Sequence, residues 1–353
     1  MPDKAEGTAH PTVALDGFGA ERGFEVLAEG ARRAAADGTR LRVYGPAEQL
    51  GLEGTEGVEV VPTTESIGNE DEPIAAVRSR PKASIVRAAS DVAAGNADAM
   101  ASVGSTGATM AAATFGVRRL HGVQRPALAV LLPLPGKPVL FLDVGANVEV
   151  RPQHLVQFAF LGAAFSAAVL GVAKPTVGLL TVGEESGKGT PAVVKAHQTL
   201  AAAEGIDFAG NVEGDDLPAG KADVVVTDGF TGNVALKLME GTAKTVAAAI
   251  RDAARSNPLA AAGGLLMRPA LSGLRKDLDP DNTGGAVLLG LRSAAVVGHG
   301  ASGPDGVANA VRLAARCVKQ DAVERTAELL RTGHATRGDL APPPANVEER
   351  IEA

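Results

Sequence analysis

Three segments of this chain share one pattern, in which a short apolar strand runs into a glycine-rich turn and a helix starts from that turn. The strands are Ala97–Val103, Thr176–Val182 and Ala222–Thr227, and the turns that follow them are Gly104–Gly107, Gly183–Gly189 and Asp228–Asn233. Each turn presents backbone N–H groups and the positive end of a helix dipole at the carboxyl edge of a sheet, where anions bind. The pattern predicts a phosphate site.

The rest of the chain alternates between short apolar runs and helical periodicity. Strands are expected at Thr12–Leu15, Leu41–Tyr44, Val58–Val61 and Leu288–Val297, helices at Phe24–Ala36, Ser84–Ala94 and Asp305–Leu330, and a β-hairpin pair at Leu128–Leu132 and Val139–Asp143. Such alternation predicts an α/β fold whose largely parallel sheet is flanked by helices. We expect one domain over residues 12–332, with disordered tails at 1–11 and 333–353.

A projecting helical hairpin is predicted for residues 234–278. Val234–Ser256 is helical with few breakers, and Pro258–Leu278 mixes leucines with Arg268, Arg275 and Lys276. The first helix has apolar positions on more than one side, which indicates packing against a symmetry mate in a dimer. Leu259–Leu274 combines apolar anchors with cations, a mix typical of helices that contact a membrane surface. Packing of these leucines within the dimer is the alternative.

Composition excludes several classes of protein. The net charge of −7 argues against a nucleic-acid binder. The single cysteine, Cys317, excludes an internal disulfide and a cysteine-based zinc cluster, and it indicates a buried small side chain in a cytoplasmic protein. Phe158–Ala173 is too short to span a bilayer and is expected to be a buried helix. The basic clusters Arg78–Lys82 and Arg118–His121 are either a solvated face or a docking site for a small acidic carrier.

Several motifs, in this order and spacing, resemble those of the bacterial phosphate acyltransferase (PlsX) family. The resemblance runs from about Val13 to Val318 and rests on Asp143–Asn147, Gly183-Glu184-Glu185 with Lys188-Gly189, Asn211–Gly214, Asp228–Asn233, Gly284–Ala286 and His299-Gly300. The first motif departs from the family's usual Asp-Ala-Met-Gly-Gly-Asp, because Asp16 is followed here by Gly-Phe-Gly-Ala-Glu.

The resemblance implies an enzyme that moves a fatty acyl group from acyl carrier protein to inorganic phosphate, giving acyl phosphate for phospholipid synthesis. It also implies a homodimer with a fold related to phosphotransacetylase and the isocitrate-dehydrogenase group, without metal or cofactor. A cytoplasmic location follows, with peripheral contact to the membrane or to a membrane-bound glycerol-phosphate acyltransferase. The alternatives are a non-catalytic paralogue that binds acyl carrier or acyl phosphate, and an NAD-dependent dehydrogenase on the same fold.

Acyl transfer to phosphate needs little covalent chemistry from the protein, because phosphate is itself the nucleophile. The site must hold a dianion beside a thioester carbonyl and stabilise the oxyanion that forms. The catalytic candidates are Lys188 as a positive charge, Asn233 as an amide donor and His299. The candidates for binding phosphate or substrate are Asp16, Gly104, Ser105, Thr106, Gly107, Asp143, Asn147, Glu184, Glu185, Asp228 and Gly232.

Each candidate also has a structural interpretation. Lys188 is equally a solvated loop lysine, Asn233 a plain residue of a helix start, and Asp228 a helix cap. Asp16 or His299 orients phosphate or protonates the departing thiol, or it merely satisfies a turn. Both lie at predicted strand ends, which we expect to share one sheet edge with the glycine-rich turns.

Overall fold

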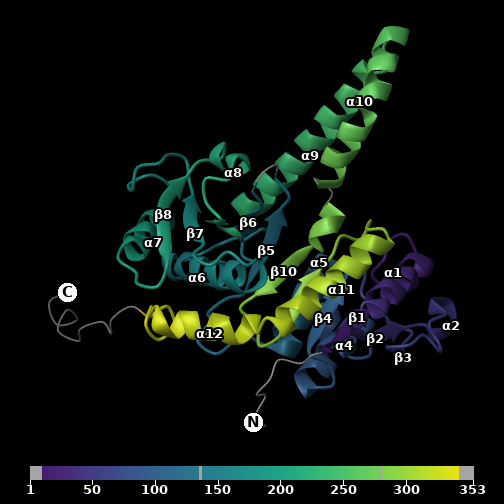
Figure 1. Ribbon diagram of the computed structural model, residues 1–353. Coiled ribbons are helices and arrows are strands. Elements are labelled where there is room, and N and C mark those ends of the chain that lie inside the picture. Colours follow the sequence, from purple (N-terminus) through teal and green to yellow (C-terminus); the bar gives the residue numbers. More distant parts are fainter. Residues whose placement is uncertain (1–9, 135–136, 278–279, 342–353) are drawn as a thin grey trace.

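The computed structural model describes residues 10–134, 137–277 and 280–341 (Figure 1). Its described strands form one sheet of 11, in the order β3-β2-β1-β4-β11-β10-β5-β6-β9-β7-β8. The strands are β1 Thr12–Asp16, β2 Arg40–Gly45, β3 Val58–Pro62, β4 Ala99–Ser102, β5 Ala127–Leu132, β6 Val139–Leu142, β7 Thr176–Leu180, β8 Asp207–Val212, β9 Val224–Val226, β10 Ala286–Leu289 and β11 Ala294–Val297. The predicted α/β class is confirmed.

The sheet is largely parallel, but its direction reverses near the centre. β10 runs antiparallel to both β11 and β5, and β5 runs antiparallel to β6. Consequently β1, β4 and β11 point one way, whereas β6, β9 and β7 point the other. The carboxyl ends of these two sets lie at opposite edges of the sheet, so the expectation that all the turns share one edge is wrong.

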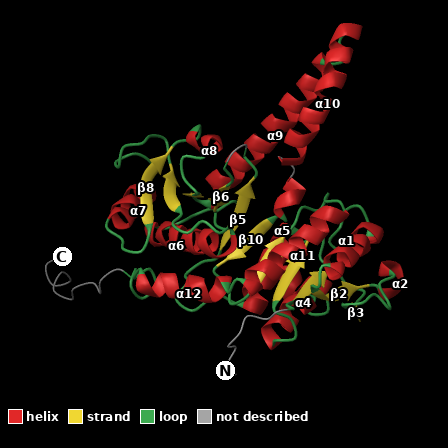
Figure 2. Cartoon of the chain, in the orientation of Figure 1, coloured by secondary structure: helices red, strands yellow, loops and turns green. Residues whose placement is uncertain are grey.

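Helices cover both faces of the sheet (Figure 2). The core of one face takes side chains from α1, α2, α6, α7, α11 and α12, and that of the other from α3, α4, α5 and α8. Along β1, Val13 and Leu15 join the first core and Ala14 the second, as strand alternation requires. The helices are α1 Phe24–Ala36, α2 Ala47–Leu50, α3 Pro73–Ser79, α4 Ser84–Ala94, α5 Thr106–Ala112, α6 Pro152–Val169, α7 Pro191–Ala201, α8 Asp216–Ala219, α11 Pro304–Lys319 and α12 Ala322–Thr332, with a π-helix at Ala113–Val117 and a 3₁₀ turn, η2, at Pro280–Thr283.

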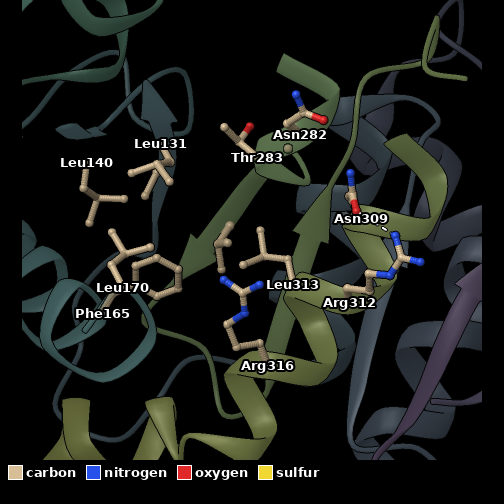
Figure 3. Close-up of a pocket in the computed structure, with 13 residues that line it drawn as sticks. Leu131, Leu140, Phe165, Leu170, Asn282, Thr283, Asn309, Arg312, Leu313 and Arg316 are labelled. Atoms are coloured by element: carbon tan, nitrogen blue, oxygen red, sulfur yellow. Dashed lines mark hydrogen bonds between the residues drawn. The ribbon is translucent and has the colours of Figure 1, made fainter. Parts of the chain in front are cut away.

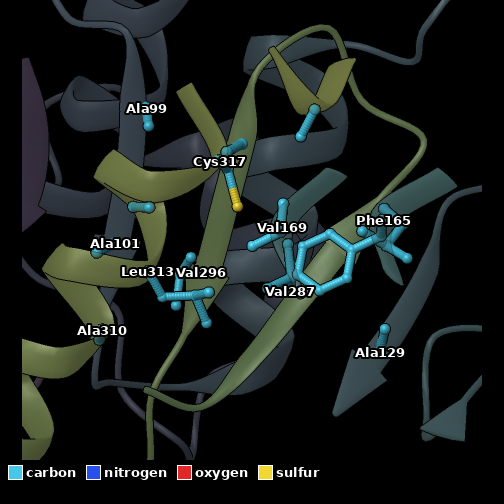
Figure 4. Close-up of a cluster of buried hydrophobic side chains, with 14 of the residues drawn as sticks. Ala99, Ala101, Ala129, Phe165, Val169, Val287, Val296, Ala310, Leu313 and Cys317 are labelled. Atoms are coloured by element: carbon cyan, nitrogen blue, oxygen red, sulfur yellow. The ribbon is translucent and has the colours of Figure 1, made fainter. Parts of the chain in front are cut away.

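The most apolar stretch of the sequence forms α6, which is buried along almost its whole length, as predicted. Among the described residues, no helix has both the length and the hydropathy to cross a bilayer. Cys317 lies in the core near Val287, Val296 and Leu313 (Figure 4). Burial raises the pKa of its thiol to about 12, which fits a packing role.

The predicted hairpin is present and projects from the body as α9 Gly229–Ala253 and α10 Pro258–Asp277 (Figure 1). α9 starts five residues earlier than expected, because the Asp228 carboxylate caps it by accepting a hydrogen bond from Thr231 N–H at 2.8 Å. The predicted turn Asp228–Asn233 is therefore the cap and the start of a helix rather than a loop. The side chains of 268–280, which include the predicted cations Arg268, Arg275 and Lys276, lie outside the described residues.

Two other boundaries differ from the expectation. The predicted closing helix is two helices, α11 and α12, separated at Asp321, which has a left-handed φ of 50°. Residues 333–341 are not a free tail, because Ala335 is buried and its carbonyl accepts a hydrogen bond from Gln157 Nε2 at 2.8 Å. Pro11 is likewise buried and bonded to Arg40 N–H. Residues 1–9 and 342–353 lie outside the described residues.

Candidate functional site

A buried carboxylate lies where β1 and β4 end side by side. Asp16 is 6% exposed, and its two oxygens accept hydrogen bonds from Ser84 Oγ at 2.6 Å and Ser102 Oγ at 2.8 Å. Phe18 N–H donates to the same carboxylate. Burial raises the pKa of Asp16, while these three hydrogen bonds oppose the rise. The carboxyl group is therefore held in place and shifted toward its protonated form.

Asp16 faces a cavity of about 170 Å³. Four segments line the cavity: the turns after β1 and β4, the loop after β3 and the loop after β11. Its residues include Gly19, Glu21, Gly68, Gly104, Ser105 and Gly300. Gly19 and Gly104 must be glycine, because a Cβ on either would come within 3 Å of the other's backbone. The first motif, which begins at Asp16, and the predicted turn Gly104–Gly107 thus form one site.

Ser105 and its neighbours start α5 beside this cavity. Ser105 Oγ caps the helix by accepting from Ala108 N–H at 3.4 Å. Thr106 and Gly107 belong to the first turn, whose N–H groups have no intrahelical acceptors. The absent side chain of Gly107 is explained by packing, since a Cβ there would meet Pro73 Cγ at 2.6 Å.

His299 follows β11 at the same edge, and its exposed ring closes a local turn. Its Nδ1 accepts a hydrogen bond from Ala301 N–H at 3.1 Å, and its carbonyl accepts from Ser302 N–H. The next residue, Gly300, lines the cavity and accepts from Glu21 N–H at 2.9 Å. The structure therefore brings the loop of His299, rather than its ring, against the cavity.

Asp143 and Asn147 form a second group at the opposite edge, after β6. Asp143 is fully buried and accepts hydrogen bonds from four backbone N–H groups, those of Leu128, Gly145, Ala146 and Asn147, and from Asn147 Nδ2. Burial raises the pKa of this carboxyl group too, against those bonds. With its oxygens saturated in this way, Asp143 organises the loop.

This loop supports the start of α9. The Asn147 carbonyl accepts from Gly229 N–H at 2.7 Å, and a Cβ on Gly232 would lie only 1.9 Å from the Asp143 carbonyl oxygen. Asp228 is the helix cap. Asn233 is exposed in the second turn of the same helix. Thus Asp143, Asn147, Asp228 and Gly232 meet through contacts that fix the backbone.

The loop after β7 carries a third group. Asn211 holds it by donating from Nδ2 to the carbonyls of Gly183 and Glu185, and Asn211 Oδ1 accepts from His197 Nδ1 at 2.9 Å. Glu184 pairs with Lys221, whose pKa is raised by the carboxylates of Asp216 and Glu184. These contacts order the loop from which the predicted site residues project.

Lys188 is exposed, and the aliphatic part of its side chain packs on Gly183, where a Cβ would lie 2.9 Å from Lys188 Cγ. In the part of the chain that the structure describes, no hydrogen bond or salt bridge joins this group, the Asp143 group and the Asp16 group to one another.

Sequence reasoning missed Ser84, Ser102 and Asn211. Asn211 lies within a recognised motif and Ser102 within a predicted strand, whereas Ser84 is brought to Asp16 by the fold alone.

A groove of about 160 Å³ lies between α6 and α11, over β5 and β10 (Figure 3). Its wall is apolar on the α6 side, with Phe165 and Leu170, and Leu313 projects from α11. Arg312 is tied to Asp37 and to Asn309, while the exposed Arg316 is in no salt bridge among the described residues. The groove thus has an apolar wall on the α6 side and polar side chains, Asn309, Arg312 and Arg316, on the α11 side.

Comparison with solved structures defines the class of fold. The EutD phosphotransacetylase from Staphylococcus aureus matches with a TM-score of 0.56 and 19% identity, over 90% of this chain and 96% of that chain. A phosphotransacetylase from Streptococcus pyogenes matches with a TM-score of 0.57 and 17% identity, over 89% of this chain and 94% of that one. The fold is therefore that of the phosphotransacetylases, as expected.

Sequence comparison gives the family. The model of the family described as "Fatty acid synthesis protein" matches residues 12–325. A phosphate acyltransferase from Elusimicrobium minutum is 44% identical over 314 residues, covering 87% of this chain and 92% of that protein. One from Geobacillus sp. is 41% identical over 328 residues, covering 92% and 99%. The chain belongs to the phosphate acyltransferase family and is an acyltransferase.

Proposed function

We propose that this protein transfers a fatty acyl group from acyl carrier protein to inorganic phosphate, giving an acyl phosphate for phospholipid synthesis. The observation that carries the proposal is the Asp16 cavity, which two glycine-rich turns line in a chain whose near-full-length relatives are phosphate acyltransferases. The volume of this cavity, about 170 Å³, suits a small anion better than a nucleotide. No observation favours the dehydrogenase alternative.

In the proposed reaction a phosphate oxygen attacks the thioester carbonyl carbon, and the tetrahedral intermediate collapses with loss of the carrier thiolate, which takes up a proton. The first-turn N–H groups of Thr106 and Gly107 and the Ser105 hydroxyl are assigned to phosphate. Asp16, whose pKa is raised by burial, is assigned to the proton that the thiolate receives.

Lys188 and Asn233 complete the proposed machinery as a positive charge and an amide donor for the oxyanion. Both are exposed on elements outside the Asp16 group, so they reach substrate only through loop closure or from a second copy of the chain. We assign that copy to a homodimer formed through α9, which exposes Val234, Leu238, Val246 and Ile250. The proposed protein is thus a homodimer.

The acyl chain is assigned to the groove between α6 and α11. The 299–303 loop separates this groove from the Asp16 cavity. Ser302 Oγ and Gly303 N–H both donate to Asp281, and Asn309 of the groove donates to the Asp281 carbonyl at 2.9 Å. A chain in the groove would therefore lie beside the loop that borders the phosphate cavity.

We also propose a cytoplasmic protein that contacts the membrane through the outer half of its hairpin, directly or beside a membrane-bound glycerol-phosphate acyltransferase. Leu259, Leu265, Leu266 and Met267 are each more than half exposed there. Delivery at the bilayer suits an amphiphilic product. Binding through such residues and neighbouring cations would be weak, reversible and salt-sensitive.

Mass-spectrometric detection of acyl phosphate, formed from acyl carrier protein thioester and phosphate, tests the reaction. Lys188→Ala and Asn233→Ala are expected to lower turnover by about 10²-fold or more, as loss of an oxyanion donor does. Because both side chains are exposed, the variants should unfold at the wild-type urea concentration. Binding of carrier without any acyl phosphate would instead support the non-catalytic paralogue, and near-normal turnover of either variant would remove that residue from the machinery.

A further inference from the structure

A group of arginines surrounds two exposed apolar side chains beside the end of α5. Ile74 and Phe115 are 46% and 45% exposed. The guanidinium of Arg78 lies over the Phe115 ring, 5.1 Å from its centre. Ile74 and Arg78 are one turn apart on α3 and so share its face. We call the following set the arginine patch: Ile74, Arg78, Phe115, Arg118, Arg119 and Arg292.

Backbone contacts bring the other arginines to the same place. Arg118 follows the π-helix that carries Phe115, and its carbonyl accepts a hydrogen bond from Arg292 N–H at 3.0 Å. Arg292 Nε donates a hydrogen bond to the Arg119 carbonyl at 3.2 Å, and the backbones of Arg119 and Leu291 pair in an isolated antiparallel β-bridge. Segments that are far apart in the sequence thus form one cationic surface.

The charge of this patch is not neutralised. None of its four arginines forms a salt bridge among the described residues, whereas Arg80, close by in sequence, is paired with Asp71 at 2.7 Å. The chain as a whole has a net charge of −7, whereas these four arginines, without salt bridges, give the surface around Ile74 and Phe115 a positive charge. Such a surface attracts an acidic partner with an apolar strip of its own.

We propose that the arginine patch docks the acidic acyl carrier protein, an inference that rests on the proposed function for the identity of the donor. Aromatic residues and arginines are the side chains that dominate binding at protein interfaces. The carboxylates of the carrier pair with the arginines, and its apolar strip covers Ile74 and Phe115.

The patch is joined by hydrogen bonds to the start of α9. Arg119 Nη1 donates to the Gln124 carbonyl. The next residue, Arg125, donates to Asn147 Oδ1 at 3.4 Å, and the Asn147 carbonyl in turn accepts from Gly229 N–H. A carrier docked on the patch would therefore contact a segment that is bonded to the start of the helix that carries Asn233.

The test is the double charge reversal Arg78→Glu/Arg118→Glu, which leaves the carbonyl-bonded Arg119 and Arg292 in place. The matched control is Arg40→Glu/Arg325→Glu, with the same change in net charge at two other exposed arginines without salt bridges in the described structure. Binding of unacylated carrier is measured by titration calorimetry at low and high salt. The patch variant should bind at least about tenfold more weakly at low salt, and the control should bind like wild type.

Kinetics separate this proposal from the function on which it rests. With the carrier thioester, the patch variant should show a KM raised about tenfold and a kcat near that of wild type. With S-acyl pantetheine, which has no protein to dock, wild type and variant should react alike. Equal carrier binding by the patch variant and wild type, or equal loss in the control, would overturn the docking site. Absence of acyl phosphate from wild type with either donor would instead refute the proposed function.

Discussion

Replacement of Gly232 by alanine should damage this protein far more than the same change elsewhere in α9. A Cβ at Gly232 would lie 1.9 Å from the Asp143 carbonyl oxygen, so one backbone segment must move by about 1.5 Å to reach an ordinary contact. Neither segment moves easily, because Asp143 is held by five hydrogen bonds and Gly229 is bonded to Asn147. Overpacking of this kind costs up to about 3 kcal/mol.

Alanine also favours a helix over glycine by about 1 kcal/mol, so Gly232→Ala should lower the free energy of unfolding by about 2 kcal/mol. Gly241→Ala is the matched control in the same helix. A Cβ there meets nothing within 4 Å, and stability should rise by about 1 kcal/mol.

Urea unfolding followed by far-ultraviolet circular dichroism measures both variants, which suits a chain with no Trp. In the absence of urea, where Gly232→Ala stays folded, it should also fail to form acyl phosphate, because the shift of α9 displaces Asn233. Equal stability of the two variants would refute the argument that the Asp143 loop fixes the helix start.

Four further outcomes are expected. Because burial raises the pKa of Asp16, the stability that its protonated form contributes is fully present below the ordinary pKa of 3.8 and is lost as the pH rises through the raised pKa. Asp16→Asn should therefore flatten the fall in unfolding free energy above pH 3.8, measured by urea titration. Leu238→Asp, in the exposed face of α9, should shift sedimentation from dimer to monomer; a wild-type monomer at micromolar concentration would contradict the dimer. Leu265→Glu/Leu266→Glu should co-sediment less with anionic liposomes while staying dimeric, and equal partitioning would return those leucines to protein packing. Leu170→Trp should lower kcat/KM for long acyl donors more than for short ones, and a uniform effect would count against the groove.

The elements of the fold were predictable because each strand and helix leaves a local pattern. Ser84–Ala94 is a helix at the predicted bounds, ending at Gly95 with a left-handed φ of 80°. The strand directions were not predictable in the same way. Nothing local to Leu128–Leu132 or to Ala286–Leu289 shows that these strands pair with each other in the middle of the sheet. β10 is antiparallel to both β11 and β5, so these two strands run the same way, and the antiparallel pair of β5 with β6 then reverses the second half of the sheet. The predicted turns consequently lie at opposite edges.

The candidate site divides along the same line. Gly19 and Gly104 lie in two motifs that sequence reasoning treated separately, and the parallel pairing of β1 with β4 makes them touch. Ser84 has no motif of its own, since it is the first residue of α4 and becomes a partner of Asp16 only through the fold. In the described chain neither Lys188 nor Asn233 contacts the Asp16 group. Their proposed roles therefore rest on the family motifs alone.

The two buried aspartates show how geometry separates residues that sequence and titration treat alike. Burial raises the pKa of both Asp16 and Asp143, and both follow a strand. Asp143 accepts five hydrogen bonds, four from backbone N–H groups, so protonating it or changing it would disturb the loop that carries α9. Asp16 is bonded mainly by two serine hydroxyls, which can rotate to accept as well as donate, and it lines a cavity. Proton exchange with a substrate is therefore compatible with Asp16, and the role left to Asp143 is to hold the start of α9 in place.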